Sequence, residues 1–318
     1  MDQLGAMRTF VEIVDQGSLT AAAGRLHVSL PVVVRTLAAL EHRLGVRLLN
    51  RTTRRIHLTE VGAEFYQRCK RIAADVEEAE QAVSAQQRTP TGTLTVNAPL
   101  LFGRMHVTPL IGAFLERNPE VRVELTLSDR IVDIIEDGVD VAVRIGHLPD
   151  SGLAATPLGH TKRVLVASPG YLRKFGTPIA PEDLGQHNCL RFDAMMAGHD
   201  WRFQRNGRTV SIRVSGSFAS NSGDAVIQSA LEDCGIASVL HYQVMDYVAS
   251  GQLCLLLQAY AADPVPIHAV FAHPRLGSAK VRAFVDHLKD GFAGRSFLPA
   301  GMNADGAVNT LKSVQAKS

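Results

Sequence analysis

Apolar residues recur at helical spacing in three short segments at the start of the chain. The first predicted helix should end at Gly17, which suits the left-handed backbone of a helix C-terminus. Ser18 can cap a second helix over residues 18–26, and Ser29 a third, whose first turn tolerates Pro31. Because a tight break separates the last two helices, the pattern predicts a helix-turn-helix. The apolar residues expected to face its core are Leu4, Met7, Phe10, Val11 and Val14 in the first helix and Val33, Leu37, Leu40 and Leu44 in the third.

Residues 46–59 predict two short strands around an arginine-rich turn, the wing of a winged helix. Thr59 can then cap a long helix over about residues 60–87, whose apolar residues follow one another at steps of four and three. We expect nothing in the chain itself to cover this seam, so that a second copy packs on it; packing on the neighbouring domain is the alternative. The seam consists of Phe65, Cys69, Ile72, Val76, Ala79 and Val83.

A Thr-Pro-Thr-Gly break at residues 89–92 separates this helix from a region in which strands and helices alternate. Strands are predicted over 93–99, 121–127 and 139–146, and the helices between them over 106–118 and 130–137. This order is typical of a parallel βαβαβ unit.

A second run of α/β pattern follows and predicts another lobe. It holds a strand over 162–169, a hairpin over 203–214 that turns at Asn206-Gly207, and a helix over 222–234 flanked by short strands. Crossings near residues 160–163 and 265–268 would leave a cleft between two lobes. The expected boundaries are 1–59 for the winged helix-turn-helix, 60–88 for the linker helix, 89–298 for the two-lobed domain (lobe I 92–162 and 268–295, lobe II 163–267) and 299–318 for a loose tail.

Composition narrows the class of protein. Hydrophobic residues make up 46% and charged residues 20%, as in ordinary proteins with sizeable cores. We expect a cytoplasmic protein without membrane contact, because no apolar run is long enough to cross a bilayer and no secretory leader precedes the first helix. Neither metal nor cofactor is expected, because the four cysteines are widely spaced and the histidines are scattered: Cys69, Cys189, Cys234 and Cys254.

Basic charge is concentrated in the first quarter of the chain. Residues 1–71 hold 11 Lys/Arg and 6 Asp/Glu, although the whole chain carries only +2. Five arginines lie in a stretch without any acidic residue: Arg43, Arg47, Arg51, Arg54 and Arg55. A basic run that follows a helix-turn-helix pattern points to phosphate binding.

These motifs resemble one family of bacterial proteins. The segment SLTAAAGRLHVSLPVVVRTLAALEHRLGVRLLNRTTRRIHLTEVG, residues 18–62, is similar almost position for position to the signature of LysR-type transcriptional regulators. The resemblance continues through GTLTVNAPLLFGR, LSDRIVDIIEDGVDVAVRIG and ASNSGDAV, and covers roughly residues 1–295. It implies DNA binding, a two-lobed α/β effector domain like type 2 periplasmic binding proteins, and homodimers or homotetramers joined through the linker helix.

The exposed face of the predicted recognition helix should meet the DNA bases. Arg35 is the side chain there that could bind guanine through two hydrogen bonds, although a phosphate contact is an equal alternative. Family members usually carry Ser or Thr where Val34 stands, so an apolar contact replaces a hydrogen bond at that position. The wing arginines should bind the backbone or an AT-rich minor groove, unless the hairpin is merely solvated. The expected DNA contacts are Ser29, Leu30, Pro31, Val34, Arg35, Arg51, Arg54 and Arg55.

Effector contacts are expected at loop ends and helix N-termini of the two lobes, where backbone amides lack partners. Arg144 would favour a carboxylate ligand, and a salt bridge with Asp129 or Asp140 is its alternative role. For Leu100 and Phe102, the alternative role is packing in the core. The expected contacts are Pro99, Leu100, Phe102, Ser128, Arg144, Asn221, Ser222 and Asp224.

Other functions were weighed against a ligand-responsive regulator. An exported solute-binding protein would lack the helix-turn-helix, and an enzyme would carry a nucleophile or cofactor motif, none of which we find in the sequence. The chain is therefore not expected to be an enzyme. A constitutive DNA binder with a vestigial cleft is the more serious rival. The expected partners are double-stranded DNA, a small organic acid or aromatic effector and a second copy of the chain, with RNA polymerase as a candidate.

Overall fold

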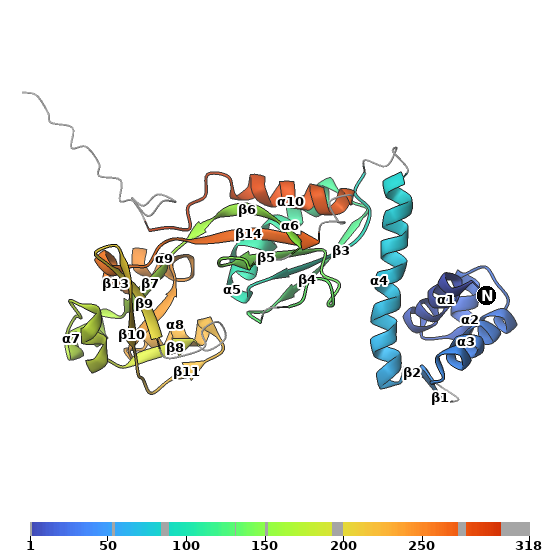
Figure 1. The fold of residues 1–318 in the computed structure, drawn as a ribbon, viewed down its shortest axis with the longest axis horizontal. Helices are drawn as coiled ribbons and strands as arrows, with labels where there is room; N and C mark the ends of the chain where they lie inside the picture. The colour runs from blue at the N-terminus through green and yellow to red at the C-terminus, as the bar shows by residue number, and fades with distance from the viewer. Residues whose placement is uncertain are drawn as a thin grey trace, which may run out of the picture. The chain divides into compact units, whose positions relative to one another are not determined.

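The computed structural model describes residues 2–52, 55–83, 89–130, 132–149, 152–192, 200–272 and 278–299. The chain forms two compact units, Met1–Arg88 and Thr89–Ser318, called here the N-terminal unit and the C-terminal unit. Each unit has its own hydrophobic core, and Figure 1 shows the elements of both. Of the expected tail, residues 300–318 lie outside the described part of the chain.

The N-terminal unit begins with the three expected helices, α1 (Gln3–Gln16), α2 (Leu19–Arg25) and α3 (Leu30–Leu44). Gly17 ends α1 in the left-handed conformation with φ of 62°, and the Ser18 hydroxyl accepts a hydrogen bond from the N–H of Ala21 at the start of α2. The chain bends by 110° between α2 and α3. This angle lies in the range of a DNA-binding helix-turn-helix, so the predicted motif is confirmed.

Two details of α3 differ from the prediction. Ser29 occupies the N-cap position, but its side chain makes no capping hydrogen bond. Leu44 is 37% exposed, whereas Val33, Leu37 and Leu40 are buried as expected. The prediction for Leu44 was wrong because Gly45, with φ of 70°, ends the helix and turns the chain away immediately after this residue.

A hairpin and a long helix complete the N-terminal unit: β1 (Leu49–Thr52), β2 (Arg55–Leu58) and α4 (Glu60–Val83). The two strands pair antiparallel, with Leu49 opposite Leu58. Thr59 caps α4 as predicted, because its hydroxyl oxygen accepts a 2.9 Å hydrogen bond from the N–H of Gly62. The same hydroxyl donates to the carbonyl of Arg47, so the cap also ties α4 to the hairpin.

The expectation that nothing in the chain covers the α4 seam was wrong for its first half. Phe65 lies with its ring centroid 5.7 Å from that of Phe10 in α1, and Cys69 is fully buried in the same core. Tyr66 extends this contact through a hydrogen bond to Asp15. Ile72, one turn further on, is 39% exposed. The side chains of Ala79 and Val83 lie outside the described set.

The first lobe of the C-terminal unit is a five-stranded sheet of order β4-β3-β5-β14-β6. Strands β3, β4 and β5 pair parallel, as the sequence predicts, whereas β14 pairs antiparallel with β5 and with the edge strand β6. Helices α6 and α10 pack against each other and against this sheet (Figure 1). The elements are β3 (Gly92–Ala98), α5 (Leu100–Phe102), the π-helix η1 (Gly103–Val107), α6 (Thr108–Arg117), β4 (Val121–Leu127), β5 (Val141–Ile145), β6 (Leu153–Thr161), β14 (Val265–Ala272) and α10 (Ala279–Phe292).

The second lobe is a sheet of order β11-β8-β12-β7-β13, to which the predicted hairpin β9–β10 is added as a separate pair. Asn206 and Gly207 form the hairpin turn with φ of 52° and 73°. The chain enters this lobe after Lys162 and leaves it through residues 261–264. The elements are β7 (Arg163–Ala167), α7 (Pro169–Phe175), η2 (Pro181–Gln186), β8 (Cys189–Phe192), β9 (Asp200–Arg205), β10 (Arg208–Arg213), β11 (Ala219–Ser220), α8 (Gly223–Leu231), β12 (Ile236–Leu240), α9 (His241–Ala249), β13 (Cys254–Leu256) and η3 (Gln258–Tyr260).

The helix predicted over residues 130–137 is not formed, and residues 134–138 make only a turn. The Asp133 carboxylate accepts hydrogen bonds from the N–H groups of Ile135 and Glu136, which closes the turn locally. Gly138 then adopts a φ of 66° and ends it. The segment therefore forms a wall of loops beside β5 instead of a crossover helix.

Candidate functional site

The exposed face of α3 is the first candidate site. Leu30 is 40% exposed, Pro31 and Arg35 are exposed, and Val34 is half-buried. The opposite face of the helix is buried against α1 and α2, so these side chains are the ones that α3 presents to a partner. Ser29, just before the helix, is also exposed.

The hairpin β1–β2 is held to the same helix. The Glu41 carboxylate of α3 accepts hydrogen bonds from the N–H of Leu48 at 2.8 Å and from that of Leu49 at 3.2 Å. This link fixes the start of β1 relative to α3, so that helix and wing form one surface. Arg51 lies in β1 and Arg55 in β2, where only their backbone is described, and Arg54 lies outside the described residues.

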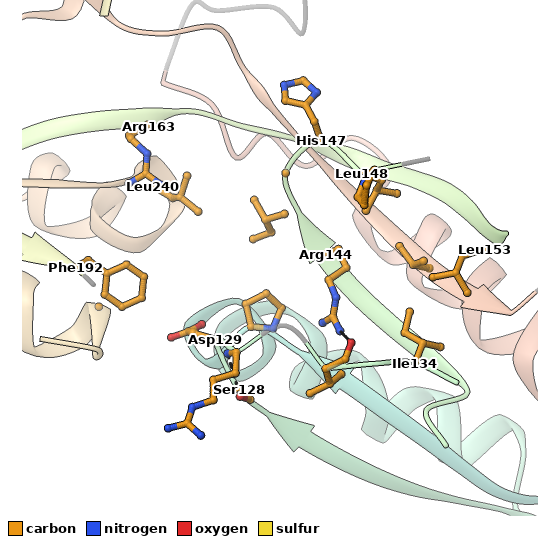
Figure 2. A pocket seen from close by; sticks show the side chains of 18 of the residues that line it. Ser128, Asp129, Ile134, Arg144, His147, Leu148, Leu153, Arg163, Phe192 and Leu240 are labelled. Atoms are coloured by element: carbon orange, nitrogen blue, oxygen red, sulfur yellow. Dashed lines mark hydrogen bonds between the residues drawn. The ribbon is translucent and has the colours of Figure 1, made fainter. Parts of the chain in front are cut away.

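The second candidate site is a cavity of about 630 Å³ in the C-terminal unit. Its wall is made by both lobes, from the ends of β3 and β4 and the loops after them on one side to β7, β8, β12 and the start of α9 on the other. Figure 2 shows part of this wall, with Arg144 in the middle. The volume lies in the range of pockets that hold small organic ligands.

Arg144 is the polar side chain on this wall that is best placed to bind a ligand. Its Nη1 donates a 2.6 Å hydrogen bond to the side-chain oxygen of Asn97, a buried residue whose amide nitrogen donates to the carbonyl of Thr126. Further bonds run from Nη1 and Nη2 to the carbonyls of Val143 and Val132, both at 3.3 Å. Among the described residues, Nε and one hydrogen of Nη2 remain available for a ligand.

The alternative role of Arg144, a salt bridge, does not apply within the described part of the chain. Asp140 instead forms a salt bridge with Lys280, with 3.3 Å between Oδ2 and Nζ. The Asp129 carboxylate accepts a hydrogen bond from the backbone N–H of Leu100. The Arg144 side chain is half-buried, and this burial lowers the pKa of its guanidinium. An anion placed beside it would therefore gain a charge-assisted hydrogen bond in a poorly hydrated site.

The other predicted ligand residues are distributed as follows. Pro99 and Ser128 lie on the cavity wall with Arg144. Gly223, the first residue of α8, also lies on this wall. Near that terminus, Ser222 caps α8, Asn221 is exposed and Asp224 lies 3.8 Å from Arg104. Leu100 is 40% exposed, and Phe102 is fully buried in an aromatic cluster behind the wall, because its ring fills the core between α5 and α9.

Several wall residues were not predicted from the sequence, above all Arg163, Phe192, Leu240 and Tyr242 of the second lobe. Arg163 donates a 3.3 Å hydrogen bond to the carbonyl of Ser238, and burial lowers its pKa. The predicted crossing at residues 160–163 was the signal that could have found it, because a chain that passes between two lobes must border their cleft. The remaining three come from β8, β12 and α9, whose positions follow only from the folded lobe.

An aromatic cluster joins the two lobes beside the cavity. Phe102 and His106 of the first lobe lie with ring centroids 5.2 Å and 5.5 Å from Tyr242 of the second, and Phe297 packs on both. The Nε2 atom of His106 is buried without a hydrogen-bond partner in the described structure. The pKa of His106 is lowered from 6.5 to about 4, mainly by burial and also by the charge of Arg295, while Asp246 opposes the shift. His106 is therefore neutral at pH 7.

Replacing His106 with phenylalanine is expected to reduce the acid sensitivity of the C-terminal unit. The unfolded chain binds a proton at His106 below pH 6.5, whereas the folded chain does so only near pH 4, so stability present above pH 6.5 is lost as the pH falls through this window. Because His106 is only half-buried, solvent screening reduces the loss to about 1–2 kcal/mol. Urea unfolding followed by the fluorescence of Trp201, the single tryptophan, measures it at pH 7 and pH 4.5. An equal loss for both proteins would contradict the prediction.

Within the described ranges, no group of His, Cys, Asp or Glu side chains is arranged to hold a metal ion. Among those residues no single helix is long and apolar enough to cross a membrane, and α2 and α3 pass that test only jointly, across their 110° bend. Burial raises the pKa of the Cys69 thiol to about 11 and that of Cys189 to about 12, so both thiols are protonated at neutral pH.

Comparisons with known proteins connect both sites to one family. Residues 4–63 match the family described as "Bacterial regulatory helix-turn-helix protein, lysR family", and residues 87–293 match the "LysR substrate binding domain". A curated HTH-type transcriptional regulator of Xanthomonas campestris pv. campestris is 38% identical over 285 residues, which cover 88% of this chain and 82% of the relative. The HTH-type transcriptional regulator CrgA of Neisseria meningitidis is 35% identical over 283 residues, which cover 89% and 94%.

Solved structures agree with these relatives. The structure of CrgA, a LysR-type transcriptional regulator from Neisseria meningitidis, aligns with a TM-score of 0.60 at 34% identity and covers 92% of this chain and 99% of its own. The full-length structure of the Vibrio cholerae virulence activator AphB aligns with a TM-score of 0.58 at 28% identity and covers 90% and 98%. The similarity therefore spans both units.

Proposed function

The chain belongs to the LysR family of bacterial transcriptional regulators, with a helix-turn-helix DNA-binding domain and an effector-binding domain, and from this premise we propose what it recognises. The N-terminal unit binds a specific double-stranded DNA sequence. The cavity of the C-terminal unit binds a small organic acid or aromatic effector that changes this binding. The observation that carries the ligand proposal is Arg144, a partly buried guanidinium that no described carboxylate neutralises, on the wall of a largely apolar cavity.

For DNA, the proposal assigns base contacts to α3 and backbone contacts to the wing. Arg35 is the exposed arginine on α3 that can reach guanine, and Leu30 and Val34 can contact thymine methyl groups. Ser29 and Pro31 flank these side chains at the start of the helix, where phosphates approach a helix N-terminus. The wing residues Arg51, Arg54 and Arg55 are assigned to phosphates or the minor groove.

For assembly, the proposal is a cytoplasmic homodimer or homotetramer held through the second half of α4. Ile72 and Val76 continue the heptad seam beyond the residues that α1 covers, and Ile72 is 39% exposed. Two copies of the recognition helix would then read two half-sites of an operator, as symmetric dimers do. Contact with RNA polymerase is an extension of this proposal that applies if the protein activates transcription.

Fluorescence anisotropy with the full-length protein tests the proposed function. A labelled duplex from the chromosomal region upstream of the gene should bind about 1,000-fold more tightly than a scrambled duplex at physiological salt. Addition of a carboxylic acid that fits the cavity should change this affinity, and Arg144→Gln should remove the response without changing DNA binding in the absence of acid. Specific DNA binding that no acid alters would favour the rival function, a constitutive DNA binder.

Replacing Arg54 or Arg55 with alanine is expected to weaken binding to all DNA sequences alike. Each arginine assigned to a phosphate releases about one counterion on binding, so each variant should flatten the slope of log K against log salt by about one unit. Anisotropy titrations at several salt concentrations measure this slope. Arg173→Ala, which removes an exposed charge from α7 in the C-terminal unit, serves as the control and should leave it unchanged. A loss confined to one operator base pair would contradict the backbone role.

A further inference from the structure

The cavity of the C-terminal unit extends to both sides of Arg144. Figure 2 shows Arg163, Phe192 and Leu240 on one side of Arg144 and Ile134, Leu148 and Leu153 on the other. The first group belongs to the second lobe, so that its chamber lies between the lobes. The second group belongs to the first lobe alone. We call these the interlobe chamber (Arg163, Phe192, Ser238, Leu240 and Tyr242) and the apolar chamber (Val132, Ile134, Leu148, Leu153 and Val270).

The apolar chamber is defined by five hydrocarbon side chains, and Asp133 and His147, their neighbours along the chain, also line the cavity. Its five residues belong to a small hydrophobic cluster that is separate from the main core of the unit, and Ile134 and Val270 in this cluster are 5% and 2% exposed. Val132, Leu148 and Leu153 are half-buried, so part of their surface lacks dispersion contacts that a ligand's hydrocarbon can supply.

The polar groups of the wall around Arg144 select the charge of the ligand. Of the two carboxylates on this part of the wall, Asp129 already accepts the N–H of Leu100, and Asp133 accepts those of Ile135 and Glu136. Arg144 is held in place by Asn97 and retains unused N–H groups. Asp129 and Asp133 keep their negative charge, so it is the unused N–H groups of Arg144 that favour an acceptor with negative charge beside this guanidinium.

We propose that the effector is an amphipathic monocarboxylate, an arylalkyl or branched alkyl acid, whose carboxylate binds Arg144 and whose hydrocarbon group fills the apolar chamber of the first lobe. This inference rests on the proposed ligand response of the same cavity and deepens it. It excludes short hydrophilic diacids, because they would leave the apolar chamber empty. It also places the specificity of the site in one lobe, so that the interlobe chamber contributes little to the choice of ligand.

Isothermal titration calorimetry of the full-length protein tests the proposal with three probes: 3-phenylpropanoate, its neutral amide and succinate. The phenyl acid should bind at least about tenfold more tightly than the other two. Leu148→Trp, which fills the apolar chamber from a loop, should weaken the binding of 3-phenylpropanoate by at least about tenfold. Phe192→Trp is the matched control in the interlobe chamber and should change the affinity for this acid by less than about threefold. Arg144→Gln should make acid and amide bind equally.

A second variant keeps the test decisive if Leu148→Trp does not fold. Leu148→Ala enlarges the apolar chamber and should shift preference from 3-phenylpropanoate toward 3-(2-naphthyl)propanoate. Acid binding that Phe192→Trp weakens and both Leu148 variants leave unchanged would overturn the inference, while the proposed function would stand. Binding of succinate as tight as that of the phenyl acid would overturn it equally. If no acid alters DNA binding in the anisotropy assay, the proposed ligand response itself fails.

Discussion

Replacing Ile72 and Val76 of α4 with aspartate is expected to convert the protein to monomers and to abolish specific DNA binding. Ile72 is 39% exposed in the single chain and begins the part of the seam that α1 leaves open. A carboxylate buried without a partner at each of these positions costs several kcal/mol per copy, about enough to dissociate a dimer at micromolar concentration. Light scattering measures the mass, and anisotropy on the operator duplex measures the loss of binding.

The controls separate association from folding. Gln67 is exposed on the opposite side of α4, so Gln67→Asp adds a carboxylate to the helix without touching the seam and should leave the oligomer intact. Circular dichroism should show the same helix content in both variants. The assembly proposed for α4 would be refuted by a double variant that retained the mass of the parent protein.

Much of the N-terminal unit was predictable from local sequence signals. Gly17, Ser18 and Thr59 mark helix ends whose chemistry is decided by neighbouring residues, and each acts as expected in the structure. The covered half of the α4 seam could not be predicted in the same way. Whether Cys69 meets α1 or a second copy depends on the angle at which α4 leaves the hairpin, and no local pattern encodes that angle.

In the C-terminal unit, the missed elements are those in which tertiary pairing overrides local preference. The segment that forms β6 contains Pro157 and Gly159, both of which argue against a strand. It is nevertheless a strand because it lies at the sheet edge, and an irregularity between Ile267 and His268 of β14 absorbs the change in register beside Pro157.

The candidate cavity was predictable only where it meets the ends of strands. Pro99, Ser128 and Arg144 follow or end the parallel strands, and general rules for α/β sheets place ligands there. The apolar chamber was not predictable. Residues 130–137 have the apolar spacing of a helix, so the sequence assigned Ile134 to a helix face, whereas in the structure it lines the cavity.

Replacing Gly62 with alanine is expected to unfold the N-terminal unit selectively. A Cβ atom at this position would lie 2.0 Å from the carbonyl oxygen of Leu48 and 3.0 Å from the hydroxyl of Thr59. Leu48 cannot move aside, because its carbonyl accepts the N–H of Thr59 and its own N–H donates to Glu41. Overpacking against fixed backbone costs about 3 kcal/mol, and the strain falls on the joint between α4 and the wing. DNA binding should be lost with it.

Urea denaturation with two probes measures this effect. Trp201, the single tryptophan, reports only the C-terminal unit and should unfold at the same urea concentration as in the parent protein, whereas circular dichroism at 222 nm should show earlier loss of helix. Gly24→Ala is the matched control: it lies in α2, an added Cβ there meets nothing within 4 Å, and it should stabilise the unit by up to about 1 kcal/mol. If Gly62→Ala were as stable as Gly24→Ala, the close approach of α4 to Leu48 would not exist in solution. The interpretation that Glu41 links α3 rigidly to the wing would then be wrong.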